Sequence, residues 1–169
     1  MKKMLAMLLA VLTLCFGAAA MAESVEVTDV EGAFDGVWVQ FEDAGFQIYV
    51  PSEWIDLEIS DEEAESGVFF HAASEDGAYE MNITYTELDH AITHEEMKAI
   101  LEENSTNTAD IEINGIPAVA CYDEDDDLYT LFVLGENGIG MYAFGFAPAS
   151  DDGMTQIADV IVASFSAIE

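Results

Sequence analysis

The chain contains no arginine, and Lys2, Lys3 and Lys98 are its only lysines against 35 aspartates and glutamates. Proteins that bind nucleic acid neutralise phosphate groups with arginine and lysine, so this composition excludes nucleic acid as a partner. Anionic membrane surfaces should repel the chain for the same reason. The excess of carboxylates predicts a solvated acidic exterior that gathers diffuse cations and suits a salty surrounding.

Cysteine is scarce as well, because Cys15 and Cys121 are the only two in the chain. If the first 22 residues are removed as a signal, Cys121 has no partner for an internal disulfide, and stability must come from packing. Cys121 lies within an apolar, strand-like run, so we expect a small buried hydrophobic side chain rather than a reactive thiol.

The first 22 residues have the pattern of a secretory signal peptide. Lys2 and Lys3 precede the apolar run Met4–Phe16, which is too short to span a bilayer, and Ala20-Met21-Ala22 supplies small residues for cleavage. We expect cleavage after Ala22 and a secreted protein, periplasmic or extracellular, with no membrane insertion after signal removal. A lipid anchor on Cys15 is the alternative, but Leu14 is larger than such sites accept.

Removal of residues 1–22 sharpens the composition. It leaves 147 residues (169 − 22), enough for one domain with its own core, and a net charge of −34 (1 − 35), because Lys98 becomes the only basic residue. Residues 23–36 are acidic and weakly patterned, which predicts a poorly ordered lead-in. Residues 37–169 then form a single domain.

Strands dominate the first half of this domain. Residues 37–41 and 46–50 alternate in hydrophobicity around a turn with Gly45, which predicts a hairpin. Pro51 ends its second strand, because proline lacks a ladder donor. We expect a further strand at 55–59, a loop through the acidic "SDEEAESG", and a second hairpin from 68–73 and 78–86.

The second half combines two helices with a meander. Thr93 and Glu96 form a capping box ahead of "HEEMKAILEEN", which predicts a helix with a stripe of Met97, Ile100 and Leu101. A closing helix is predicted by apolar spacing from Met154 to Phe165. The strands of the meander are expected at 110–113, 116–122, 128–134 and 139–147, with an Asn114-Gly115 turn between the first two.

These elements predict an α+β fold. The sequence favours a single domain with an antiparallel β-sheet of hairpins and a meander, flanked by two or more helices. Runs such as "LYTLFVL" and "IGMYAFGFA" are almost continuously apolar, so both faces of that sheet should be covered, one of them by helices.

Three short segments follow one another in a distinctive order. "GFQIYVPSEW" is an alternating strand that ends in Pro-x-x-Trp, and "INGIPAVACY" and a final helix ending in "IVASFS" come after it. Across residues 37–166 this plan resembles the PsbP and DcrB group of small exported α/β proteins. The resemblance implies a PsbP-like sandwich and an accessory or binding role rather than an enzyme. That group shares no catalytic residue set, and the absence of arginine here argues against a basic docking surface.

Histidines offer one candidate metal site. His90 and His94 stand four residues apart in "DHAITH", a spacing that suits a transition metal when both lie on one helix. Thr93 as the helix cap would leave His90 outside the helix, and Ala91 occupies the place where a zinc protease motif needs glutamate. We therefore expect no metal there, and a structural role for His71, which stands alone in a strand.

The densest group of carboxylates is "DEDDD", from Asp123 to Asp127. An EF-hand loop would use Asp123, Asp125 and Asp127 as its first ligands, but Leu128 and Leu134 occupy the places that need glycine and glutamate. A hairpin turn is the better interpretation, because aspartate side chains bond nearby backbone amides.

No catalytic constellation emerges elsewhere. "GENGIG" joins two predicted strands and is a turn rather than a phosphate loop. Trp54, Tyr142, Phe144 and Phe146 have the alternating spacing typical of a core rather than of a ligand groove. No catalytic residue and no cofactor are predicted.

The sequence thus favours a secreted, acidic, non-enzymatic binding or accessory module with an unknown protein or small-molecule partner. The alternatives are a carboxylate-dependent hydrolase, with Asp123 and Glu124 as its acids, and a low-affinity cation-binding protein.

The signal peptide gives the first testable prediction. Protein recovered from the exported fraction should begin at Glu23, because the small-residue cleavage site ends at Ala22. Intact-mass spectrometry measures this directly. Retention of the first 22 residues, or a diacylglycerol adduct on Cys15, would contradict a freely secreted product.

Overall fold

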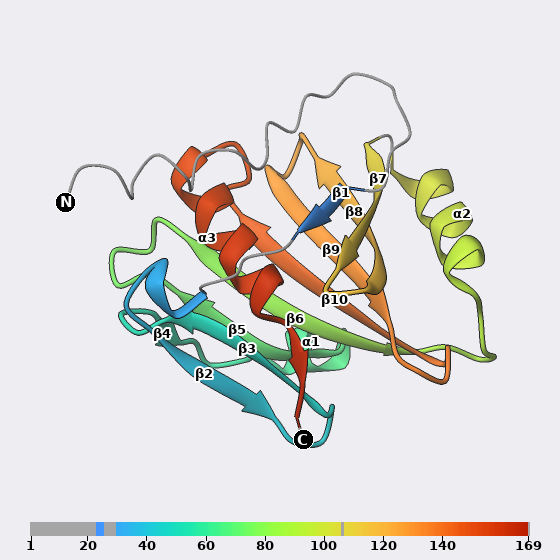
Figure 1. Cartoon of the computed structure of the whole chain (residues 1–169), viewed down its shortest axis with the longest axis horizontal. Coiled ribbons are helices and arrows are strands. Elements are labelled where there is room, and N and C mark those ends of the chain that lie inside the picture. Colours follow the sequence, from blue (N-terminus) through green and yellow to red (C-terminus); the bar gives the residue numbers. More distant parts are fainter. Residues whose placement is uncertain (1–22, 26–29, 106, 169) are drawn as a thin grey trace.

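The computed structural model describes residues 23–25, 30–105 and 107–168, and the predicted signal segment lies outside this part. The described residues form one α+β domain of packed layers (Figure 1). A large sheet stands in the centre, a small sheet and one helix cover one of its faces, and two further helices lie on the other. The predicted fold class is confirmed.

The large sheet has eight strands in the order β1-β7-β8-β9-β10-β6-β5-β4. Only the β1–β7 pair is parallel, so the predicted antiparallel arrangement holds for the rest. Its strands are β1 (Glu23–Val25), β4 (Ile55–Asp56), β5 (Val68–Ala73), β6 (Glu80–Glu87), β7 (Thr108–Ile113), β8 (Ile116–Asp123), β9 (Leu128–Leu134) and β10 (Gly140–Ala147).

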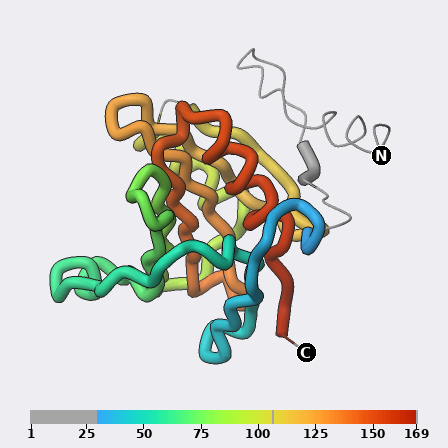
Figure 2. The backbone as a smooth tube through the Cα atoms, turned by 90° about the vertical axis from the view of Figure 1, so that its left-hand side faces the viewer, coloured from blue at the N-terminus to red at the C-terminus, as the bar shows by residue number. Residues whose placement is uncertain are grey.

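The small sheet has three strands in the order β11-β3-β2, all antiparallel. They are β2 (Gly36–Phe41), β3 (Phe46–Pro51) and β11 (Ser166–Ala167). The helices are η1 (Val30–Gly32), α1 (Asp61–Glu65), α2 (His94–Asn104) and α3 (Asp152–Ser164). Figure 2 follows the chain through both layers and shows the described N-terminal part (blue) beside the C-terminal end (red).

The main core fills the space between the large sheet, the small sheet and α3. Phe46 of β3 lies at its centre, with its ring 5.3 Å from Tyr142 and 5.8 Å from Phe144 of β10, and 5.0 Å from Phe165 after α3. Burial of aromatic rings of this size dominates the energetics of a small core. The predicted stripe of α3 is confirmed, because Met154, Ala158, Ile161 and Val162 are buried in this core.

A second, smaller core lies on the opposite face, beneath α2. Met97 of α2 packs there on Val119 and Cys121 of β8, with Leu101 at its margin. Cys121 is a buried free thiol, and burial raises its pKa, which fits the expected small hydrophobic role. Both faces of β8 are therefore covered, as its apolar sequence predicts.

The short turns follow their sequence signals. Asn114 and Gly115 have φ values of 51° and 84°, the left-handed conformations that a tight hairpin between β7 and β8 requires. Thr93 caps α2, and its side chain and that of Glu96 bond each other's backbone amides in the predicted capping box.

Three local predictions are wrong. The predicted loop through "SDEEAESG" contains α1, because Ser60 and Glu63 form a capping box that begins a helix at Asp61. The strand expected at 55–59 is reduced to β4, since beyond Asp56 only the Leu57 amide still bonds the neighbouring β5, at the His71 carbonyl. Ile100 is 51% exposed, because the apolar side chains through which α2 packs on the sheet are Met97 and Leu101.

Ile161 tests the docking of α3. It is fully buried, so Ile161→Asp places an unpaired charge in the main core and should lower the free energy of unfolding by roughly 4 kcal/mol or more. Gln156→Asp, at an exposed position of the same helix, is the matched control and should change it by no more than about 0.5 kcal/mol. Denaturant melts of both variants measure the difference. Equal stability of the two would show that α3 is not packed on the sheet.

Candidate functional site

The acidic run forms the predicted turn between β8 and β9. The Asp123 carboxylate accepts hydrogen bonds from the amides of Asp125 and Asp126, at 2.9 and 3.2 Å. Asp127 has a φ of 51° and accepts from the amide and the hydroxyl of Ser150, each at 2.7 Å. Two of the three carboxylates that an EF-hand loop would use are thus occupied by backbone and hydroxyl donors, as a turn requires.

The structure does not place His90 and His94 on one helical face. His94 is the first residue of α2, and its Nε2 lies 3.0 Å from the Asp110 carboxylate on β7. His90 precedes the Thr93 cap and is exposed. Within residues 23–25, 30–105 and 107–168, no group of three or more His, Cys, Asp or Glu side chains has the arrangement of a metal site.

Asp110 joins α2 to the sheet. It binds the ammonium of Lys98 as well as His94, so the one lysine of the described part is held against β7. Burial alone would raise the pKa of Asp110, but the hydrogen bonds from Lys98 and His94 lower it further than burial raises it. These contacts hold α2 on β7, and both Lys98 and His94 are bound to Asp110.

His71 has partners that the sequence did not reveal. Its Nδ1 lies 3.2 Å from Glu63 of α1, and its Nε2 lies 3.9 Å from Glu80 of β6. Glu63 also accepts from the hydroxyl and the amide of Ser60, and these bonds lower its pKa. His71 therefore ties α1 to β5, which agrees with a structural role. The Ser60–Glu63 capping box was a signal for the start of α1, but it does not indicate the contact with His71.

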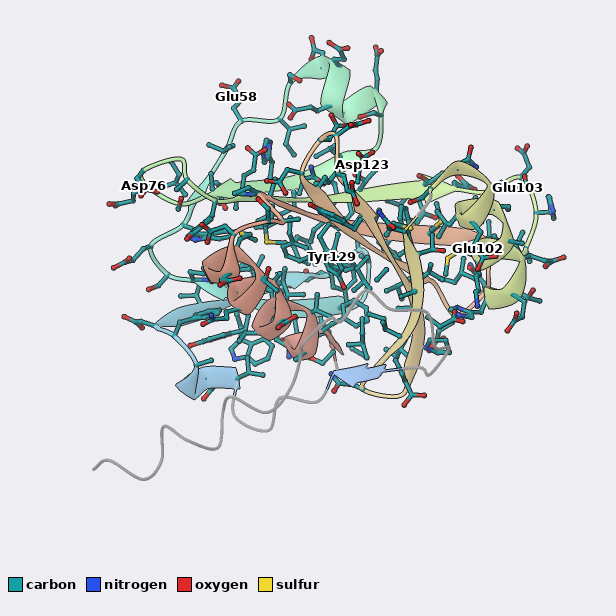
Figure 3. All side chains as sticks on the ribbon, turned by 90° about the horizontal axis from the view of Figure 1, so that it is seen from above. Glu58, Asp76, Glu102, Glu103, Asp123 and Tyr129 are labelled. Atoms are coloured by element: carbon teal, nitrogen blue, oxygen red, sulfur yellow. The ribbon has the colours of Figure 1, made fainter. Side chains whose placement is uncertain are left out.

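Several acidic side chains away from these contacts lie at the surface. Figure 3 shows Glu58, Asp76, Glu102 and Glu103 at the periphery of the molecule, whereas Tyr129 lies among interior side chains. Burial raises the pKa of the Tyr129 hydroxyl. These four carboxylates therefore contribute diffuse charge to the surface.

The two sheets end in four edge strands, and β2 differs from the other three. β1, β4 and β11 have only three, two and two residues, and β1 and β4 each carry a carboxylate. β2 has six residues, "GVWVQF", without charge or proline. Proteins normally protect edge strands by shortness, charge or proline, so β2 is an unprotected edge.

The backbone of β2 is paired on one side. Its residues Gly36–Phe41 pair with β3 in regular antiparallel register. In the part of the chain that the structure describes, the backbone groups of Val37, Trp38, Val39 and Gln40 make no hydrogen bond outside that pair. One side of the strand thus presents unpaired donors and acceptors.

Two apolar side chains accompany this edge. Val37 is 49% exposed and Trp38 is 39% exposed, although both are large and hydrophobic. The indole of Trp38 packs on the buried ring of Tyr49 at 5.4 Å, and its Nε1 donates to Glu31 at 3.1 Å. Trp38 is therefore held in place on the surface. We call Gly36–Phe41, with these two side chains, the β2 edge.

The sequence predicted the hairpin that contains this strand but not its position at an edge. Strand order depends on contacts between distant segments, which the local pattern does not encode. One signal was present, since "GVWVQF" is an uncharged stretch in a strongly acidic chain.

The acidic turn yields a prediction in solution. Asp125→Asn combined with Asp126→Asn should raise the melting temperature at low ionic strength, because both carboxylates are exposed within a cluster of like charge. The control variant combines Glu58→Gln with Glu75→Gln, which removes the same amount of charge from two separated exposed positions. It should raise the melting temperature less. Thermal melts in matched sodium, magnesium and calcium chloride complete the test.

A calcium site predicts a different pattern. Calcium at about 100 times its dissociation constant would add roughly 2.7 kcal/mol to wild-type stability, and the double Asn variant would lose this gain. Such a calcium-specific shift would contradict the interpretation of "DEDDD" as a turn only.

Comparison with known proteins supports the fold. No protein-family model and no curated protein matches the chain. The solution structure of cyanobacterial PsbP (CyanoP) from Synechocystis is similar to this chain, with 13% sequence identity and a TM-score of 0.53. The alignment covers 90% of this chain and 99% of that chain. The crystal structure of a protein from Bacteroides thetaiotaomicron is also similar, with 14% sequence identity and a TM-score of 0.52. That alignment covers 74% of this chain and 46% of the other chain. The described domain therefore has a PsbP-like fold.

Proposed function

We propose that this protein is an exported, acidic, non-enzymatic binding or accessory module that engages its partner through the β2 edge. The observation that carries the proposal is the unprotected edge strand with exposed Val37 and Trp38. Exposed apolar residues beside an open edge are an aggregation hazard unless a partner covers them, which favours a binding role.

The fold agrees with this role. A PsbP-like domain is compatible with an accessory or binding module, although a fold alone assigns no function. None of the helices in the described part is long and apolar enough to cross a membrane. Release from the signal peptide after Ala22, as the sequence predicts, would deliver the domain to the cell exterior or the periplasm.

The Trp38 ring gives the proposal its specificity. Tryptophan is enriched among the residues that dominate binding energies, especially where neighbouring rings hold it in one orientation. Here the ring of Tyr49 packs against the indole of Trp38. The same Tyr49 ring stacks on Phe34, with 5.4 Å between the ring centroids. A pre-positioned aromatic ring loses little conformational entropy when a partner covers it.

Photocrosslinking in the native host tests this proposal. The exported full-length chain would carry p-benzoylphenylalanine in place of Trp38, or in place of Glu103 on α2 as a matched exposed control. We expect one discrete crosslinked product from position 38, identifiable by mass spectrometry, and none from position 103. Thermal melts confirm that both variants fold. Equal yields from the two positions, or no discrete product from either, would contradict a binding role for the β2 edge.

A further inference from the structure

We infer that the occupant of the β2 edge is an extended, cationic segment of another protein, which pairs with β2 as a fourth strand of the small sheet. This inference rests on the proposed function and specifies the chemistry of the partner. Its physical basis is the combination of open backbone groups, exposed apolar side chains and flanking carboxylates on a single strand.

The backbone requires a strand as its complement. A segment that lies along β2 would satisfy the outward amides and carbonyls between Val37 and Gln40, which have no other partner in the described residues. Each such hydrogen bond contributes modestly, so the affinity depends on forming several of them together. Addition of a strand to a sheet edge is a general mode of peptide recognition, in which main-chain bonds give affinity and alternate side chains give specificity.

The two faces of β2 set the side chains of the partner. Val39 and Phe41 pack toward the main core, so Val37 lies on the same inner face, whereas Trp38 and Gln40 lie on the outer face. An added strand would place aliphatic residues beside Val37. Its alternate residues would lie beside Trp38, where a lysine or arginine gains a cation–π contact.

The charge around the strand selects a basic partner. Exposed carboxylates flank β2: Asp35 precedes it, Glu42 and Asp43 lie in the turn after it, and Glu31 lies beside Trp38. The strand between them is neutral. A cationic segment would therefore meet complementary charge at each end, and the overall charge of the protein would accelerate its approach.

The same charges disfavour a second copy of this chain. Two molecules paired edge to edge through β2 would bring Asp35 of one copy near Glu42 of the other in antiparallel pairing, and like residues together in parallel pairing. Like charges placed opposite each other destabilise strand pairs. Two copies of residues 23–169, each of net charge −34 (1 − 35), would also repel each other, most strongly at low ionic strength.

Peptide binding to the unmodified mature protein, followed by amide NMR, tests the inference. The main probe is acetyl-Lys-Val-Lys-Val-Lys-Val-Lys-amide, and the first control replaces each lysine with glutamate. Two further controls keep the lysines but carry N-methyl groups on alternate backbone amides, one set for each edge of the peptide.

The main probe should shift and protect the amides of Gly36–Phe41, with an affinity that falls as salt rises. At least one N-methylated peptide should bind about tenfold more weakly or worse, because it loses two or more main-chain bonds. The glutamate peptide should not bind.

Other outcomes would overturn the inference. Equal affinity of all three lysine peptides, with amide shifts spread over the acidic surface, would show diffuse attraction without strand pairing. Binding of the glutamate peptide would contradict the charge selection.

Protection of β2 that grows with protein concentration, without peptide, would identify a second copy as the occupant. Absence of any response at β2, alongside a discrete crosslink from position 38, would reject the cationic strand while leaving the binding role in place. Failure of both experiments would reject both.

Discussion

The structure is built under one electrostatic constraint, a single lysine among 35 carboxylates from residue 23 onward. One lysine cannot form ion pairs with so many carboxylates, and backbone amides and hydroxyl groups bind several of them instead. Glu63 and Glu96 complete capping boxes with Ser60 and Thr93, and hydrogen bonds from those caps lower the pKa of both glutamates. Because their folded-state pKa values are depressed, their contribution to stability is present above the unfolded pKa and is lost as pH falls through the folded value.

Because of this constraint, the stability of the domain depends mainly on the packing of its core. The domain has no internal disulfide, since Cys121 is the only cysteine after residue 22, and surface repulsion opposes compaction. Buried aromatic rings around Phe46 stabilise the main core. Asp110 adds a local ionic contact, because it binds both Lys98 and His94. The same repulsion disfavours edge-to-edge pairing of two copies through the neutral strand β2.

The sequence predicted the elements whose signals are local. Thr93 with Glu96 fixed the start of α2, Asn114-Gly115 fixed a hairpin, and the apolar spacing around Ile161 predicted the docked face of α3. α1 escaped prediction because its five residues show no apolar stripe, although its capping box was legible. The PsbP-like plan was also readable, from short structural motifs.

The candidate site was harder to predict, for physical reasons. The contact of His71 with Glu63 and Glu80 joins three separate elements. The position of β2 at an edge depends on the order of strands in the small sheet, which is closed by β11 at the far end of the chain. The local hydrophobic pattern contains neither fact, whereas the run Asp123–Asp127 forms the turn that its sequence predicts.

Native-state hydrogen exchange on the free mature protein tests most directly whether the β2 edge is open. Amides of Val37–Phe41 that bond to β3 should exchange slowly, and the alternate amides that face outward should exchange at nearly unprotected rates. This alternation would establish an edge available for pairing. Slow exchange at every amide of the strand would show that another part of the chain already covers the edge, and would contradict a binding role for β2.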